Sequence, residues 1–199
     1  AGHIMIADRI KDGAFDALEE LRAQGVKSLV MLTGDVRSAA KTVASSLNFD
    51  MVKAELTLDG KITAVEYMLS KKATGACLAF VGDGVGDAPV MTHADIGIAL
   101  GAVNEYSAID AADVVLMDED IRALPEARSL CRSVTDTAGQ NILLSLAAKA
   151  ILVVLGVFGV INIWIAALAE LCVLAAAIAN AGKNDIKFEK ENIDERSVQ

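Results

Sequence analysis

Apolar and polar residues alternate over the first 140 positions as short strands followed by amphipathic helices. Apolar residues recur every three or four positions in three segments, 14–21, 39–47 and 62–69, which predicts helices there. A further helix is expected from about 121 to 139. Short apolar runs predict strands at 3–7, 26–32, 51–54, 76–81, 96–100 and 114–117. This alternation favours an α/β fold with a parallel sheet.

The pattern changes after residue 140, where polar positions almost disappear. Residues 142–161 and 163–181 form two apolar runs, each about the 20 residues that a helix needs to cross a hydrocarbon core. The uncharged residues 159–162, from the end of the first run to the residue before the second, predict a tight turn. We therefore expect a membrane hairpin at 141–181, after a domain at 1–140 and before a polar cytosolic tail at 182–199. A buried helical pair in a soluble core is the alternative.

Charge follows the same division. Residues 1–140 carry 13 Lys and Arg against 21 Asp and Glu, whereas residues 141–181 hold only Lys149 and Glu170. The net charge of −9 argues against a nucleic-acid partner, because a phosphate backbone attracts basic surfaces. Three cysteines without a Cys-x-x-Cys spacing favour a reducing compartment. We expect residues 1–140 to be cytosolic and the hairpin to lie in the lipid bilayer.

Lys149 and Glu170 stand near the middle of the two predicted spans. A charge at the centre of a membrane helix costs about 2.5–3.5 kcal/mol, so it normally has a partner or a task. At ~1.5 Å per residue the two side chains differ in depth by about 8 Å, which a lysine chain could largely cover. Either the two charges have a task in the membrane, or they form a pair that only fixes the register of the two helices.

Candidate chemistry lies where strands end and helices begin, since the carboxyl ends of parallel strands open onto a crevice. Thr33-Gly34-Asp35 follows one predicted strand and could bind an anion at a helix start. Asp83 and Asp87 lie on a glycine-rich turn after another strand and could hold Mg²⁺. Lys61 lies at the start of a helix. Each feature alone also fits an ordinary turn, a solvated loop or a surface lysine.

Together these segments resemble the C-terminal third of P-type cation ATPases, which belong to the haloacid dehalogenase superfamily. The likeness covers residues 1–183, nearly the whole chain. It is carried by these segments: Ala7-Asp8, Met31 to Asp35, Gly82 to Val85 with Asp87-Ala88-Pro89, Ala94 to Ala99, Ala111 to Val115, and Gln140-Asn141-Ile142. Lys149 on the first span, and Glu170 followed by Asn180 on the second, look like the zinc, cadmium and lead-exporting branch.

The resemblance implies a haloacid-dehalogenase-like phosphorylation domain and roles for the matching residues. Asp83 would coordinate Mg²⁺ with Asp87 beside it, and Thr33, Gly34, Asp35 and Lys61 would form the phosphoryl site. Lys149 and Glu170 would line the path of a divalent heavy-metal ion. The phosphorylated aspartate, the ATP-binding domain and the earlier helices would belong to an upstream remainder of the pump. A bacterial plasma membrane is the expected location.

The chain departs from the family pattern at several positions. Asp8 is not in the setting of a phosphorylated aspartate, and Asp-Lys-Thr-Gly does not occur in the sequence. Asn is usual where Gly86 and Val36 stand, Gly-Ser-Asp is common where residues 104–106 read Asn-Glu-Tyr, and Asp is more usual than Glu170. The chain by itself is expected to be inactive. A non-catalytic membrane protein derived from such a pump, or a soluble phosphatase of the superfamily with an apolar tail, remains the alternative.

Overall fold

The structure is a computed structural model that describes residues 10–82, 84–101 and 106–196, with the side chains of 85 and 183–196 excepted. Contacts divide the chain into two compact units, residues 1–127 and 128–199. The division falls inside the long helix α6, Ala123–Val157. The boundary that we place at residue 140 marks the start of the apolar stretch and stays a prediction.

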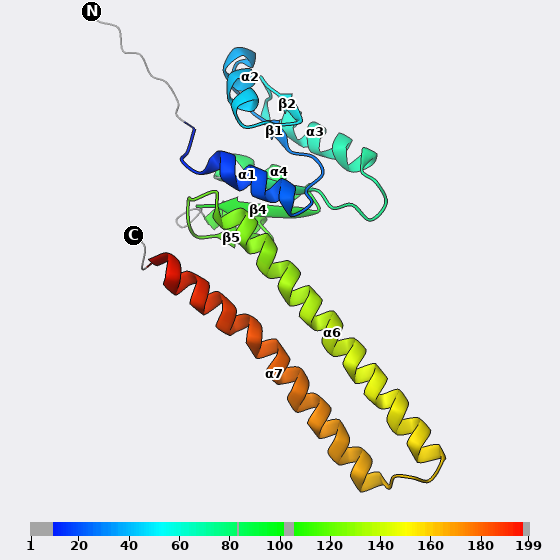
Figure 1. Cartoon of the computed structure of the whole chain (residues 1–199). Coiled ribbons are helices and arrows are strands. Elements are labelled where there is room, and N and C mark those ends of the chain that lie inside the picture. The colour runs from blue at the N-terminus through cyan, green and yellow to red at the C-terminus, as the bar shows by residue number, and fades with distance from the viewer. Residues whose placement is uncertain (1–9, 83, 102–105, 197–199) are drawn as a thin grey trace, which may run out of the picture. The chain divides into compact units, whose positions relative to one another are not determined.

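The first unit alternates strands and helices, as the periodicity predicts (Figure 1). Its elements before the glycine-rich turn are α1 (Ala14–Ala23), β1 (Val30–Leu32), α2 (Arg37–Ser46), β2 (Met51–Lys53) and α3 (Leu58–Lys71). After them come β3 (Ala79–Gly82), the 3₁₀ turn Val85–Asp87, α4 (Ala88–Met91), β4 (Ile96–Leu100), α5 (Tyr106–Ala111) and β5 (Val114–Leu116). The strand expected at 3–7 lies outside the described residues.

All strand pairs of the described residues are parallel, which confirms the predicted sheet type. They form two pieces, β1-β2 and β3-β4-β5, with Val30 opposite Met51, Ala79 opposite Ile96 and Ile98 opposite Val114. One cluster of buried side chains joins α1 to the end of α2 through Leu18, Leu21 and Leu47. A second lies under α4 and packs Met91 against Ala99 and Ala108.

Two predicted strands begin later in the structure than expected. The strand expected at 26–32 pairs only from Val30, because the Leu29 N–H donates instead to the Asp50 carboxylate and the Leu29 carbonyl accepts from the Asp50 N–H. The strand expected at 76–81 begins at Ala79, since the Leu78 carbonyl is taken by the N–H groups of Asp95 and Ile96. Side-chain and loop contacts thus replace the ladder at both strand starts.

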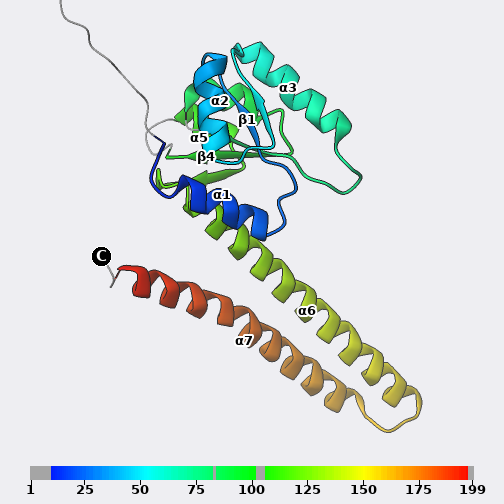
Figure 2. The same cartoon turned by 45° about the horizontal axis from the view of Figure 1, so that its top comes forward.

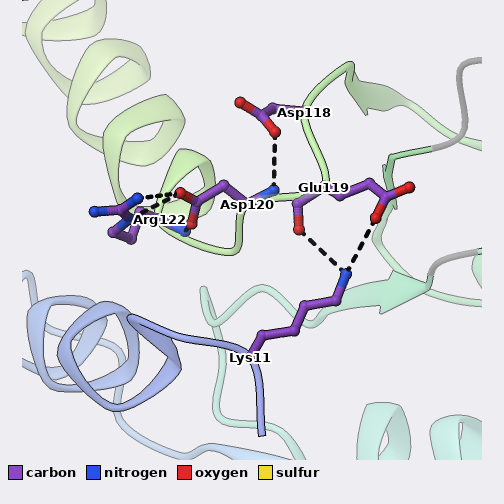
Figure 3. A network of polar contacts seen from close by, with 5 residues as sticks. All are labelled: Lys11, Asp118, Glu119, Asp120 and Arg122. Carbon is purple, nitrogen blue, oxygen red and sulfur yellow. Dashed lines mark hydrogen bonds and ion pairs between the residues drawn. The ribbon is translucent and has the colours of Figure 1, made fainter. Parts of the chain in front are cut away.

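The loop that leads into α6 contacts the segment before α1 through polar side chains (Figure 3). Lys11 Nζ donates to the Glu119 carbonyl at 3.3 Å and lies 3.8 Å from the Glu119 carboxylate. Asp120 accepts from the Arg122 N–H at 2.9 Å and from Arg122 Nε at 2.8 Å. Gly13 in the left-handed region leaves room for Arg122, whose Cδ lies 3.0 Å from where a Cβ would be.

The second unit contains most of α6 and the helix α7, Ile163–Arg196, which run antiparallel (Figures 1 and 2). Both helices are long and apolar enough to cross a membrane, by length and composition. Gly159 with φ 69° donates to the Gly156 carbonyl and ends α6, and Asn162 Oδ1 accepts from the Ile165 N–H and starts α7. The turn predicted at 159–162 therefore lies between the two helices, as expected.

Candidate functional site

The Thr33-Gly34-Asp35 segment leaves β1 as a closed loop just before α2. The Thr33 N–H donates to the Lys53 carbonyl, and its carbonyl accepts from the Leu56 N–H. The Thr33 hydroxyl donates to the Asp35 carboxylate at 2.8 Å and accepts from the Asp35 N–H at 3.1 Å. These bonds fix the loop against the residues that follow β2.

Glu55 holds the same loop from its other side, which the sequence reasoning missed. Its backbone is left-handed, with φ 59°, a conformation that is uncommon for residues other than glycine. This geometry lets the Glu55 N–H donate to the Asp35 carbonyl at 2.9 Å while its carboxylate accepts from Arg37 Nε at 3.1 Å. Glu55 thereby links the loop to the first turn of α2.

Lys61 lies in the first turn of α3, where Thr57 caps the helix by accepting from the Gly60 N–H at 3.2 Å. Lys61 Nζ donates to Asp87 Oδ1 at 2.6 Å. The side chains are 21% and 17% exposed, so this ion pair is largely shielded from water. Asp87 is the last residue of the 3₁₀ turn Val85–Asp87 and the N-cap of α4. Two distant segments are therefore joined by one charged contact.

A cavity of about 340 Å³ opens beside this ion pair. Its lining comes from the loop after β1, the start of α3 and the turn after β3, and consists of Gly34, Leu56, Leu58, Lys61, Gly86 and Asp87. The cavity is large enough for a phosphate group. It is faced by the backbone of Gly34 and Gly86, by the Lys61 ammonium and by the Asp87 carboxylate. Gly34 cannot be enlarged freely, because a Cβ would lie 3.3 Å from the Leu56 carbonyl oxygen.

The structure brings together part of the predicted phosphoryl site. Gly34, Lys61 and Asp87 line one cavity, while Thr33 and Asp35 lie beside it in the loop and bond to each other. Asp83 lies outside the described residues. Leu56 and Leu58 line the cavity as well, and no polar signal in the sequence distinguishes them.

Within the described residues, no group of three or more His, Cys, Asp or Glu side chains is placed to hold a metal ion. Among the residues that the structure describes, Asp87 is the one that contributes a carboxylate to the cavity. One or two carboxylates, with phosphate and water oxygens, are a common way of binding Mg²⁺. The donor chemistry at Asp87 therefore fits magnesium in the company of a phosphate ligand.

Lys149 and Glu170 lie on α6 and α7 in the second unit, and both are exposed. Among the ion pairs of the described residues, none joins them, so the direct contact that their depths allow is not formed here. The helices meet instead at Asn141 and Asn180, where an amide hydrogen bond of 3.0 Å links them.

Comparisons with known proteins show what this chain is similar to. The profile of haloacid dehalogenase-like hydrolases matches residues 1–95. A zinc-transporting ATPase of Synechocystis is 42% identical over 180 residues, which are 90% of this chain and 25% of that protein. A cadmium, zinc and cobalt-transporting ATPase of Bacillus subtilis is 39% identical over 181 residues, 91% of this chain and 26% of that protein.

Solved structures give the same result. A zinc-transporting PIB-type ATPase crystallised in the E2.Pi state superposes with a TM-score of 0.80 and 36% identity, over 89% of this chain and 28% of that one. This chain spans about a quarter of the length of the relatives that it matches. In sequence and in fold, it is homologous to the C-terminal part of zinc- and cadmium-transporting P-type ATPases, with a haloacid dehalogenase-like domain followed by two long apolar helices.

Proposed function

We propose that this chain is the C-terminal part of an ATP-driven exporter of a divalent heavy-metal ion of the zinc, cadmium and lead class. It supplies phosphate- and magnesium-binding residues and the last two membrane helices. The observation that carries the proposal is the cavity where Gly34, Lys61, Gly86 and Asp87 converge from three separate segments. The names of the matched relatives add the cargo class.

In this proposal the first unit neutralises a phosphoryl group that is carried by an aspartate of the upstream remainder. Lys61 supplies positive charge to the phosphoryl oxygens, and the backbone around Gly34 approaches them closely because no side chain intervenes. The Thr33 hydroxyl and the Asp35 carboxylate hold the loop in shape. Asp87, together with Asp83, would hold Mg²⁺, which neutralises phosphate charge when bound. ATP would bind to a domain of the upstream remainder.

In the second unit, Glu170 is the proposed carboxylate ligand of the transported ion and Lys149 its counter-charge when no ion is bound. Carboxylate oxygens accept Zn²⁺ and Cd²⁺, whereas Cu⁺ prefers thiolate and thioether sulfur. Both groups are exposed on the hairpin, where another membrane helix could meet them. The lipid bilayer of a bacterial plasma membrane, with residues 1–140 in the cytosol, is the proposed setting.

The test is a chimera. Residues 1–182 of this chain replace the matching C-terminal quarter of the Synechocystis zinc-transporting ATPase, and the purified protein is assayed in lipid vesicles. We expect ATP hydrolysis that rises with Zn²⁺ or Cd²⁺ and a phosphorylated intermediate, both lost in an Asp87→Asn version. A chimera that inserts and folds, but hydrolyses no ATP with Zn²⁺, Cd²⁺ or Pb²⁺, would contradict the proposal.

A second candidate, a non-catalytic membrane protein derived from such a pump, is favoured by the departures at Gly86 and Val36. Gly86 gives the cavity no polar side chain, and Val36 begins α2 without a side-chain cap. If these residues have abolished turnover, the chimera is silent and Gly86→Asn with Val36→Asn restores it. Turnover in the unaltered chimera would remove this candidate.

A further inference from the structure

Asn141 and Asn180 form a polar contact between the two apolar helices. Asn180 Nδ2 donates to Asn141 Oδ1 at 3.0 Å, and Asn141 Nδ2 donates to the Ala177 carbonyl at 3.2 Å. Both bonds are partly buried. In an apolar environment, side-chain amides that hydrogen-bond across helices help to hold the helices together. The Asn141 amide donates one hydrogen bond to α7 and accepts another from it. The two bonds therefore fix the position of α7 along α6 as well as the closeness of the two helices.

This contact sets the level of the two membrane charges. Lys149 lies eight residues beyond Asn141, and Glu170 lies ten residues before Asn180 on the antiparallel helix. At ~1.5 Å per residue, the two charges stand about 12 and 15 Å from the amide contact, in the same direction along the hairpin. They therefore differ in depth by only about 3 Å, less than the difference of about 8 Å that the predicted span ends give.

The contact also sets the side on which the charges emerge. At about 100° per residue, eight residues from Asn141 and ten from Asn180 each turn the helix by about 80° from the line that joins the two amides. The helices are antiparallel (Figure 1). By helix geometry, these two rotations therefore carry Lys149 and Glu170 to the same side of the hairpin. The charges then form a pair of neighbouring groups on one face, although no direct bond joins them.

We propose that Asn141 and Asn180 are positioning residues of the ion path, which keep Lys149 and Glu170 level and on one face of the hairpin. This inference rests on the proposed function for the role of the two charges. The positioning itself does not depend on that function. A helix shift of one residue at the amide contact would turn one charge by about 100° away from the other.

The experiment measures the hairpin in the full chain, reconstituted in phosphatidylcholine vesicles without ATP or metal. Leu146 and Leu174, two exposed apolar residues near the charges, are each replaced by a cysteine that carries a nitroxide label. The native residues Cys77, Cys131 and Cys172 are changed to Ser, so that only the two introduced cysteines are labelled. Pulsed electron–electron double resonance then gives the distance between the two labels. We expect one narrow distance for the unaltered contact and a broadened or shifted one for Asn141→Ala.

The variants have a graded expectation because Asn141 makes both bonds and Asn180 only one. Asn180→Ala should broaden the distance less than Asn141→Ala, and the double variant no more than Asn141→Ala alone. Ser145→Ala, one turn from Asn141 on the same helix, is the matched control and should leave the distance narrow. If Asn141→Ala fails to insert, Asn180→Ala carries the test. A narrow, unshifted distance in the Asn180→Ala protein would overturn the proposal.

A second measurement separates positioning from general stability. In the chimera, Asn141→Ala and Asn180→Ala should raise the Zn²⁺ concentration for half-maximal ATP hydrolysis by about three- to fifteen-fold. Phosphorylation by inorganic phosphate, which uses the cytosolic domain, should stay unchanged. An equal loss of both would mean that the asparagines only stabilise the hairpin. A silent chimera would contradict the proposed function and leave the vesicle experiment decisive for the asparagines.

Discussion

Lys61 Nζ and Asp87 Oδ1 lie 2.6 Å apart and join the first turn of α3 to the turn that follows β3. The two residues are 26 positions apart in the sequence, and each belongs to a segment that the sequence singles out for a separate reason. Their contact is the point at which the proposed phosphate-binding and the proposed magnesium-binding residues meet.

Breaking this pair should destabilise the turn at 84–91. A hydrogen bond to a charged group contributes about 1.5–3 kcal/mol, and a largely buried partner left alone keeps its desolvation cost. We expect Lys61→Ala and Asp87→Ala each to speed amide hydrogen exchange in residues 84–91. A double-mutant cycle should give a coupling of about 1–3 kcal/mol. Additive effects of the two substitutions would show that the contact contributes nothing to stability.

The glycines of the same region should differ sharply in what they tolerate. A Cβ at Gly82 would lie 2.6 Å from Met91 Cε and 2.8 Å from Asp87 Cβ, whereas a Cβ at Gly86 would meet no atom within 4 Å. Gly82→Ala should therefore cost about 1–3 kcal/mol by overpacking, and Gly86→Ala should be close to neutral. Chemical denaturation of the full chain in detergent micelles compares them. A neutral Gly82→Ala would mean that Met91 moves aside without cost.

The helices and strands of this region are largely predictable from sequence, because the local spacing of apolar residues determines them. The amphipathic period at 62–69 and the apolar run at 96–100 predict α3 and β4, and both appear. The pairing of Lys61 with Asp87 was not predicted, because a tertiary contact leaves no local signal. Glu55 was missed for a related reason: a left-handed glutamate looks like any polar residue after a strand.

The membrane part shows a different limit of sequence reasoning. Hydropathy predicts two spans and their turn. Helix α7 begins at Ile163 as expected, whereas α6 ends at Val157 and not at the predicted residue 161. Among the described residues no ion pair joins Lys149 to Glu170, and their pairing stays a prediction. Depth along a helix is readable from residue number, but the faces that two helices turn toward each other depend on tertiary contacts such as the Asn141–Asn180 hydrogen bond.

Val36 offers a stabilising substitution. It stands at the N-cap of α2, where a side chain that accepts a hydrogen bond is preferred and valine has none. Val36→Asn should raise the free energy of unfolding by about 1 kcal/mol and the melting temperature by about 3–6 °C. Val36→Ala is the matched control and should give no such gain. The measurement is thermal unfolding of the full chain in micelles, and equal melting temperatures for the two variants would refute the capping argument.

Asp95 should contribute to the loss of folding stability at acidic pH. The Lys72 ammonium and the Leu78 N–H both bond to its carboxylate and hold the pKa of Asp95 below its ordinary value of 3.8. A carboxyl whose pKa is lower in the folded state stabilises the fold above its unfolded pKa, and this contribution is lost as pH falls through the folded value. We expect Asp95→Asn to be less stable at pH 7 and to lose less on acidification below about pH 4. Parallel stability curves for both proteins from pH 7 to pH 2 would contradict this.

The last prediction separates the two membrane charges by role. If Glu170 is the ligand of the transported ion, Glu170→Ala in the chimera should abolish Zn²⁺ binding. Lys149→Ala should keep binding but slow the release that follows it, because the counter-charge that competes with the ion for Glu170 is gone. Zinc binding is measured by equilibrium dialysis and release by the rate of dephosphorylation. Glu170→Asp restores the more usual residue at this position, so it should retain binding and serves as the control. Unchanged binding and turnover in both alanine variants would reduce the two charges to a device that fixes helix register.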